Sequence, residues 1–158
     1  VTHAITLRGA QLSWAILNGN KRVENRHFSL QPGWYALHTG SKTSSLESQL
    51  SLIAGVEGMP KEADLPHSAI IGSFKVTHTL TLDQSKPTEP WAFGPMVNVL
   101  GAFCRLEHPV PHRGALSVWR IKQDALESVR KQLRHATVLQ NDNSHLPPAE
   151  MCPPSTLL

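Results

Sequence analysis

Hydrophobic positions along the chain change their spacing several times, and each change predicts a structural element. Apolar residues two positions apart are typical of half-buried strands, whereas i, i+3, i+4 spacing is typical of a helix. Strand patterns occupy residues 4–7, 21–26, 34–39, 69–82, 97–107 and 116–121. Helical patterns occupy approximately residues 11–18, 44–54 and 123–136. The polar, proline-containing segments 55–66 and 83–90 are expected to be loops.

Five or six strands interrupted by a few helices predict an α+β fold in which the sheet forms a barrel. Residues 1–139 are expected to form a single domain, because a chain of 158 residues can bury one hydrophobic core. Residues 140–158 are expected to be a proline-rich C-terminal tail. Its weak apolar periodicity predicts an extended or disordered segment unless it docks.

The segment most informative for chemistry is the end of the first helix, with the turn and the charged strand that follow. The turn is Asn18-Gly19-Asn20, and the strand at 21–26 reads KRVENR. Side chains alternate between the two faces of a strand, so Lys21 and Glu24 are expected on opposite faces. Such a segment can form the wall of a pocket for a polar or anionic ligand. The alternative is a solvated edge strand whose charges prevent aggregation.

Three sequence blocks resemble the ASCH domains (activating signal cointegrator homology) of the PUA-like superfamily. Residues 10–26 contain AQLSWAI and NKRVENR, similar to the family's QPWAWAI and GKRxENR. EPWAFGPMVNVL at 89–100 is similar to PWFxGPxxxVL, and PVPHRGALSVWRI at 109–121 is similar to PVPxRGALGLW. The resemblance covers most of residues 4–121 and is specific for the family, although not for one activity. It implies a PUA-like β-barrel flanked by helices, with a ligand cleft beside the first helix and the lysine-containing strand.

Aromatic and loop residues supply further candidates for ligand binding. Trp14 shares the polar flank of its helix, so it is expected to be partly exposed and near the ligand, where its ring can stack on a base. The family's Gln-Pro-Trp is Ala10-Gln11-Leu12 here, so one aromatic of the pattern is missing. Trp91 lies in a loop between helix breakers that can present a ring to a base. The alternatives are that Trp14 covers the edge of the core and that the 89–95 aromatics close the barrel end.

The charged candidates are Lys21, Glu24, Arg26 and Lys42. If the protein is an enzyme, Lys21 is the expected catalytic residue, acting as a general base. The planar guanidinium of Arg26 can grip phosphate or a base edge, and Glu24 can accept a hydrogen bond from a base amino group. The alternatives are a purely structural Glu24–Arg26 pair and a solvated Lys42.

Composition narrows the classes of partner. The formal net charge of +3 permits an anionic partner, and 40% apolar with 17% charged residues is typical of a globular protein. No apolar run approaches the ~20 residues of a membrane span, and no signal-peptide pattern is present, so no membrane partner is expected. Cys104 and Cys152 have neither metal nor redox spacing, which predicts a reducing, cytoplasmic location. Prolines between His108 and His112 exclude a helical histidine pair, so no metal or cofactor is expected.

Three functions fit these features. The first is nucleic-acid binding, supported by the basic strand and the aromatics, with RNA favoured over DNA by the family resemblance. The second is hydrolysis of RNA or of a modified nucleoside. Relatives that hydrolyse acylated cytidine pair a lysine, matched by Lys21, with a threonine three residues later, and that position is Glu24 here. A carboxylate cannot replace a hydroxyl nucleophile without a change of mechanism. The third is a protein-interaction adaptor, which a large exposed apolar patch would favour.

Overall fold

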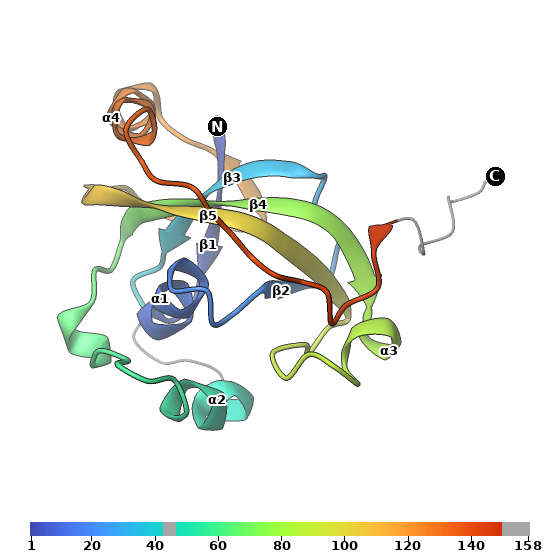
Figure 1. Cartoon of the computed structure of the whole chain (residues 1–158). Helices are drawn as coiled ribbons and strands as arrows, with labels where there is room; N and C mark the ends of the chain where they lie inside the picture. The colour runs from blue at the N-terminus through green and yellow to red at the C-terminus, as the bar shows by residue number, and fades with distance from the viewer. Residues whose placement is uncertain (43–46, 150–158) are drawn as a thin grey trace.

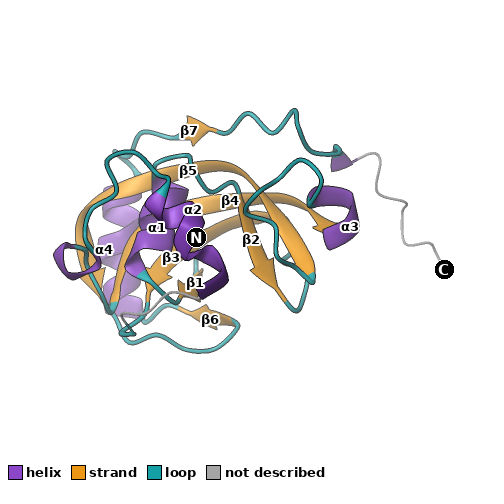
Figure 2. Ribbon diagram, turned by 90° about the horizontal axis from the view of Figure 1, so that it is seen from below, coloured by secondary structure: helices purple, strands orange, loops and turns teal. Residues whose placement is uncertain are grey.

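One mixed β-sheet organises the computed structural model, which describes residues 1–42 and 47–149 (Figure 1). Its strands are β1 His3–Leu7, β2 Val23–Arg26, β3 Gly33–Thr39, β4 Ala69–Thr81, β5 Met96–Pro111, β6 Val118–Arg120 and β7 Leu139–Gln140. The strand order is β2-β5-β4-β3-β1-β6, and β7 pairs with β5. Only β1 and β3 pair in parallel among the described strands. The sheet curls into a half-barrel (Figure 2).

Helices lie on both sides of this curled sheet. They are α1 Ala10–Leu17, α2 Leu50–Ala54, α3 Leu82–Ser85 and α4 Gln123–Leu133, together with short 3-10 turns at Glu47–Gln49 and Glu62–Asp64. Helices α1 and α4 lie on opposite sides of the sheet (Figure 1). The mixture of strands and helices agrees with the expected α+β class.

Alternation along the strands builds two hydrophobic clusters. In β1, Ile5 packs with Leu12 and Ile16 of α1, whereas its neighbour Ala4 packs with Val129 of α4. All of these side chains are buried. Burying a large aliphatic side chain stabilises the fold by about 1.5–3 kcal/mol. Both faces of β1 are therefore fixed, and with them the position of the cleft residues at its end.

The turn after α1 returns the chain to the sheet. Gly19 has φ +79°, a left-handed conformation that glycine adopts without steric cost. The next two amides, of Asn20 and Lys21, donate hydrogen bonds of 2.9 Å and 3.1 Å to the carbonyl of Ala15. This cap places Lys21 beneath the end of α1 and starts β2 at Val23.

Two elements differ from the sequence prediction for identifiable reasons. A helix was expected at 44–54. Within the described residues, this segment forms a 3-10 turn followed by the five residues of α2, and residues 43–46 lie outside the described part of the chain. The loop expected at 83–90 begins with α3, because Thr81 and Gln84 form a capping box. This Thr-x-x-Gln signature is legible in the sequence.

The segment after α4 packs along the sheet as far as it is described. Residue Gln140 pairs with Ala102 of β5, and the side-chain amides of Asn141 and Asn143 each donate a 2.9 Å hydrogen bond to the carbonyl of Leu100. Leu146 is buried in the larger cluster. Residues 150–158, the rest of the expected tail, lie outside the described residues. Within the described ranges, no helix is sufficiently long and apolar to cross a membrane.

Candidate ligand-binding cleft

Lys21 is a buried cation at the floor of a cleft. Its side chain is 1% exposed, and its ammonium group donates hydrogen bonds to the carbonyl of Val23 and to Oε1 of Glu24, the latter at 2.8 Å. The expected placement of Lys21 and Glu24 on opposite strand faces is wrong. Strand β2 begins only at Val23, so Lys21 belongs to the preceding turn and its side chain folds back onto the strand.

Glu24 joins Lys21 to Arg26 through its two carboxylate oxygens. Oε1 accepts from Lys21, and Oε2 accepts from Nε of Arg26 at 2.8 Å. Burial alone would raise the pKa of Glu24, but the charges and hydrogen bonds of Lys21 and Arg26 outweigh it and lower the pKa. The carboxylate is therefore held ionised between two cations. The array carries a net charge of +1, from two cations and one anion.

Arg26 ties this array to the end of β1. One terminal amino group of its guanidinium donates a 2.8 Å hydrogen bond to the carbonyl of Thr6, and its side chain remains 20% exposed. Two of the five N–H groups of an arginine are thus occupied. The exposed part of the guanidinium borders both chambers of the cleft.

The smaller chamber has a volume of about 340 Å³ and mixes apolar and polar walls. Leu7 and Leu12 contribute apolar surface, Phe93 contributes a ring, and the Lys21–Glu24–Arg26 array contributes charge. Its full lining is Thr6, Leu7, Arg8, Leu12, Lys21, Glu24, Asn25, Arg26, His27, Ser48, Gln49, Phe93 and Gly94.

Two amide side chains, those of Asn25 and Gln49, add hydrogen-bonding groups to the lining of this chamber. Asn25 accepts hydrogen bonds from the backbone amides of Phe93 and Gly94 at 2.8 Å and 2.9 Å, which fixes the wall that carries the ring. Gln49 is 5% exposed, and its buried Oε1 has no hydrogen-bond partner. A buried acceptor without a partner costs about 1–3 kcal/mol, so Gln49 leaves one acceptor available to a bound donor.

The larger chamber has a volume of about 660 Å³ and shares Thr6, Leu7, Arg8 and Arg26 with the smaller one. The rest of its lining is Gly40, Ser41, Lys42, Ser68, Arg113, Gly114, Ala115, Leu116 and Ser117. Arg8, Arg26, Lys42 and Arg113 are its cations, and the described lining contains no acidic side chain. Lys42 and Arg113 are exposed and form no ion pair within the described part of the chain. This chamber therefore presents uncompensated positive charge.

The backbone of the larger chamber is unusual. Ser68 and Ser117 adopt φ values of +52° and +57°, in the left-handed region that residues other than glycine enter at a cost of about 1–3 kcal/mol. Such conformations persist only where the surrounding structure enforces them, and they concentrate at functional sites. Both residues line this chamber.

A buried hydrogen-bond chain supports the 113–117 loop from below. Nε2 of the fully buried His38 lies 2.7 Å from the carbonyl of His112, so Nε2 carries the proton and Nδ1 accepts from the Thr6 hydroxyl at 3.1 Å. The indole N–H of Trp119 donates to the same hydroxyl oxygen at 2.9 Å. Burial lowers the pKa of His38, which favours this neutral form. A Cβ at Gly114 would lie 2.8 Å from Cε1 of His38, so the loop sits directly on this chain.

Of the residues proposed from sequence, the structure brings four together and separates two. Lys21, Glu24, Arg26 and Lys42 all line the cleft. Trp14 is half-buried but borders a different hollow, where the Arg105 guanidinium lies 5.7 Å from its ring centroid. Its helix presents Leu12 to the cleft and turns Trp14 toward β5.

Trp91 is buried in the larger hydrophobic cluster, as the barrel-closing alternative anticipates. Its backbone carbonyl accepts a 3.0 Å hydrogen bond from Asn25, and its amide donates to Glu89 at 2.9 Å. The ring of that loop that lines the cleft is that of Phe93, two positions after Trp91.

Sequence reasoning missed Arg8, Gln49 and Arg113. Arg113 lies in the PVPHRGALSVW block and Arg8 directly follows the first strand, so a basic residue near a strand end was a legible signal for both. Gln49 has no sequence signal, because its significance depends on burial without a partner.

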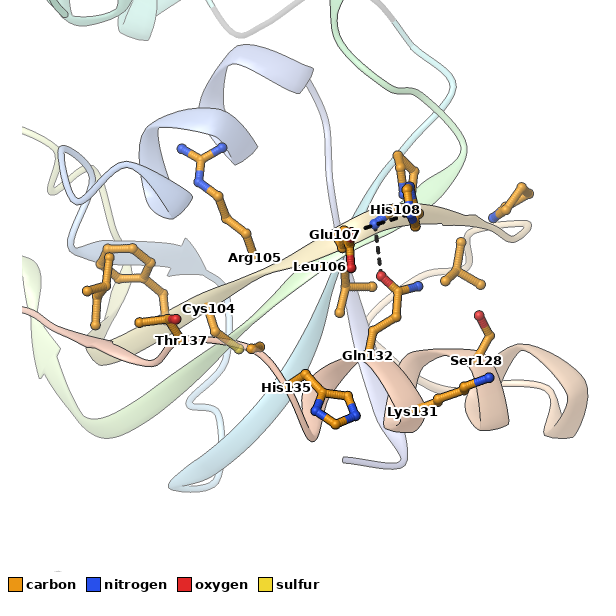
Figure 3. Close-up of a pocket in the computed structure, with 16 residues that line it drawn as sticks. Cys104, Arg105, Leu106, Glu107, His108, Ser128, Lys131, Gln132, His135 and Thr137 are labelled. Atoms are coloured by element: carbon orange, nitrogen blue, oxygen red, sulfur yellow. Dashed lines mark hydrogen bonds and ion pairs between the residues drawn. The ribbon is translucent and has the colours of Figure 1, made fainter.

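A groove beside α4 is a second hollow, with a volume of about 720 Å³ (Figure 3). Ser128, Lys131 and Gln132 of α4 and His135 of the following turn form one wall, and Gln132 Oε1 accepts a 2.8 Å hydrogen bond from the backbone amide of His108 in β5. Lys131 and His135 are exposed. No group of three His, Cys, Asp or Glu side chains within residues 1–42 and 47–149 is placed to hold a metal ion.

No protein-family model matches the chain, and no curated protein matches its sequence.

Proposed function

We propose that this chain is an ASCH domain with a PUA-like fold, and that its cleft binds single-stranded nucleic acid, RNA in preference to DNA. The observation that carries this proposal is the charge of the cleft. Five cations, Arg8, Lys21, Arg26, Lys42 and Arg113, line it with one acidic residue, Glu24, among the described residues. Phosphate neutralisation by such cations supplies most of the affinity in non-specific nucleic-acid binding.

Three further features support the same proposal. The half-barrel sheet with helices on both sides is compatible with a PUA-like barrel. The KRVENR segment and the RGA loop, which carry the family resemblance, lie on the two sides of one cleft. The Phe93 ring and the apolar side chains of the smaller chamber provide surface for a base or ribose. The preference for RNA comes from the family resemblance.

The proposal is tested by fluorescence anisotropy with labelled ten-nucleotide RNA and DNA of one sequence. We expect RNA to bind more tightly, with affinity falling as salt rises by a log–log slope of about −0.7 for each phosphate contact on a single strand. Lys42→Ala should weaken binding, whereas Lys131→Ala, the same change in the α4 groove, should not. Absence of RNA binding at low salt, or equal weakening by the two variants, would contradict the proposal.

Hydrolysis is a second candidate, because a buried lysine faces the smaller chamber. However, Lys21 acts as a donor in both of its hydrogen bonds, and both oxygens of Glu24 already accept from cations. A general base needs a free lone pair, which a protonated Lys21 lacks, and the lowered pKa of Glu24 makes its carboxylate a weak base. Product analysis after prolonged incubation with RNA and with acylated nucleosides separates the candidates. Product formation by the wild-type protein that is absent in Lys21→Arg would establish an enzyme.

A further inference from the structure

The two chambers of the cleft differ in chemistry although they share a wall. The smaller chamber holds a cation–carboxylate–cation array of net charge +1, apolar side chains, one ring and the unpartnered Oε1 of Gln49. The larger chamber holds the exposed cations Lys42 and Arg113 and serine hydroxyls, and Leu116 in its lining is 92% exposed. A nucleoside needs apolar surface with a few polar contacts, whereas a phosphate needs cations and hydroxyl donors.

We propose that the smaller chamber is a nucleoside subsite and the larger chamber is a phosphate subsite for the adjoining nucleotide. This inference rests on the proposed binding of single-stranded nucleic acid. The ligand then spans at least two nucleotides, and its backbone passes over Arg26, which lines both chambers. Lys42 and Arg113 contact the phosphate that follows the bound nucleoside.

Gln49 is the polar contact that selects the occupant of the smaller chamber. Its Oε1 is buried and has no partner, so it accepts a hydrogen bond from an N–H or O–H group of the bound nucleoside. The surrounding cations can only donate hydrogen bonds, so they cannot accept one from an N–H or O–H group of the ligand. A phosphodiester, which offers only acceptors at neutral pH, does not satisfy Oε1. The orphaned acceptor therefore separates the two subsites by hydrogen-bond direction.

Exposed Leu116 extends the larger chamber beyond the phosphate. Its loop is fixed from below by the contact of Gly114 with His38 and Thr6, and by the left-handed backbone of Ser117. Leu116 lies in the same chamber lining as the cations Arg113 and Lys42. We assign the Leu116 side chain to contact the base of the second nucleotide. The phosphate subsite then lies beside this base contact.

The test measures competition against a labelled ten-nucleotide RNA by three probes: a nucleoside, the matching dinucleoside monophosphate and inorganic phosphate. We expect the dinucleotide to compete at least tenfold better than the nucleoside. The double variant Lys42→Ala/Arg113→Ala should abolish that gain and leave nucleoside competition unchanged. Leu116→Ser should reduce dinucleotide competition alone. The matched control is Lys131→Ala/Arg134→Ala on α4, which removes the same charge and should leave every probe unchanged.

Gln49→Met gives the opposite signature. It should weaken the nucleoside and the dinucleotide by the same factor and leave inorganic phosphate unaffected. RNA binding with equal competition by nucleoside and dinucleotide in the wild type would overturn the two-subsite inference while the proposed function stands. So would a loss of nucleoside competition in Lys42→Ala/Arg113→Ala. Absence of RNA binding in the wild type would overturn both.

Discussion

The candidate cleft and the α4 groove are hollows of comparable size with different distributions of charge. In the α4 groove, Lys131 of the helix and His135 of the turn that follows it are exposed to solvent (Figure 3). In the cleft, Lys21 and Glu24 are buried and connected by hydrogen bonds. An exposed charge adds little to stability, whereas a buried charge must be paired. The comparison teaches that burial of charge, rather than volume, distinguishes a site whose geometry the fold maintains.

The largest expected effect is on stability. Lys21→Ala leaves the buried carboxylate of Glu24 with Arg26 as its remaining cation, and removal of one member of a buried pair costs about 3–5 kcal/mol. Urea unfolding should show this loss for Lys21→Ala, while Lys131→Ala should stay within about 0.5 kcal/mol of the wild type. Equal stability of the two variants would show that the buried array is not part of what holds the fold.

The next effect is on ligand affinity. Arg26→Ala removes the side chain that borders both chambers, and a hydrogen bond to a charged group contributes about 1.5–3 kcal/mol. We expect RNA affinity to fall roughly 10- to 100-fold. Arg134→Ala on α4 should leave the affinity unchanged in the same anisotropy assay. If Arg26→Ala binds RNA as the wild type does, the shared wall of the cleft is not a contact surface.

A smaller effect, of opposite sign, is expected at Gln49. Gln49→Met replaces a buried amide whose Oε1 has no partner, so it should raise the free energy of unfolding by about 1 kcal/mol. The same variant should bind RNA more weakly. Gln132→Met in the α4 groove is the matched control. It removes an acceptor that the His108 amide uses, so it should not raise the free energy of unfolding. Destabilisation by Gln49→Met would show that Oε1 has a partner in solution.

The smallest effect is a pH dependence at His38. Burial holds its folded pKa below the unfolded value of about 6.5, so the unfolded chain binds this proton more tightly. Stability from neutral His38 is complete above about pH 6.5 and is lost as the pH falls below it toward the folded pKa. In an NMR titration, the imidazole of His38 should protonate at a lower pH than that of a histidine in an unstructured peptide. Coincident titration curves would contradict the buried chain beneath the 113–117 loop.

Much of the fold is legible in the sequence because strand and helix periodicities are local. The patterns at residues 4–7, 34–39 and 123–136 match β1, β3 and α4 closely. The strand was predicted to end at 107 because Pro109 and Pro111 are typical strand breakers, but β5 continues to Pro111. Prolines are tolerated at sheet irregularities, and β5 bulges away from β4 between Arg105 and Val110.

The site was legible where its residues adjoin in sequence and at Lys42, a basic residue after a strand end. Lys21, Glu24 and Arg26 come from one segment, so their proximity could be predicted. Their geometry could not, because the turn that folds Lys21 back depends on the cap at Ala15. Arg113 reaches the cleft only through the pairing of β6 with β1, which is a long-range contact. Trp14 was ambiguous for the same reason, since helix periodicity does not say which neighbour covers a partly polar flank. Trp91 was ambiguous because a loop sequence does not say whether its ring is buried.

The most direct test of the account is a map of the RNA contact surface. Backbone amide shifts should be followed by NMR while a short single-stranded RNA is added to the labelled protein. The account predicts perturbations at residues 6–8, 24–27, 41–42 and 113–117, with none at 128–136 of the α4 groove. Perturbations confined to 128–136, or a spectrum unchanged at saturating RNA, would contradict the assignment of the cleft as the binding site.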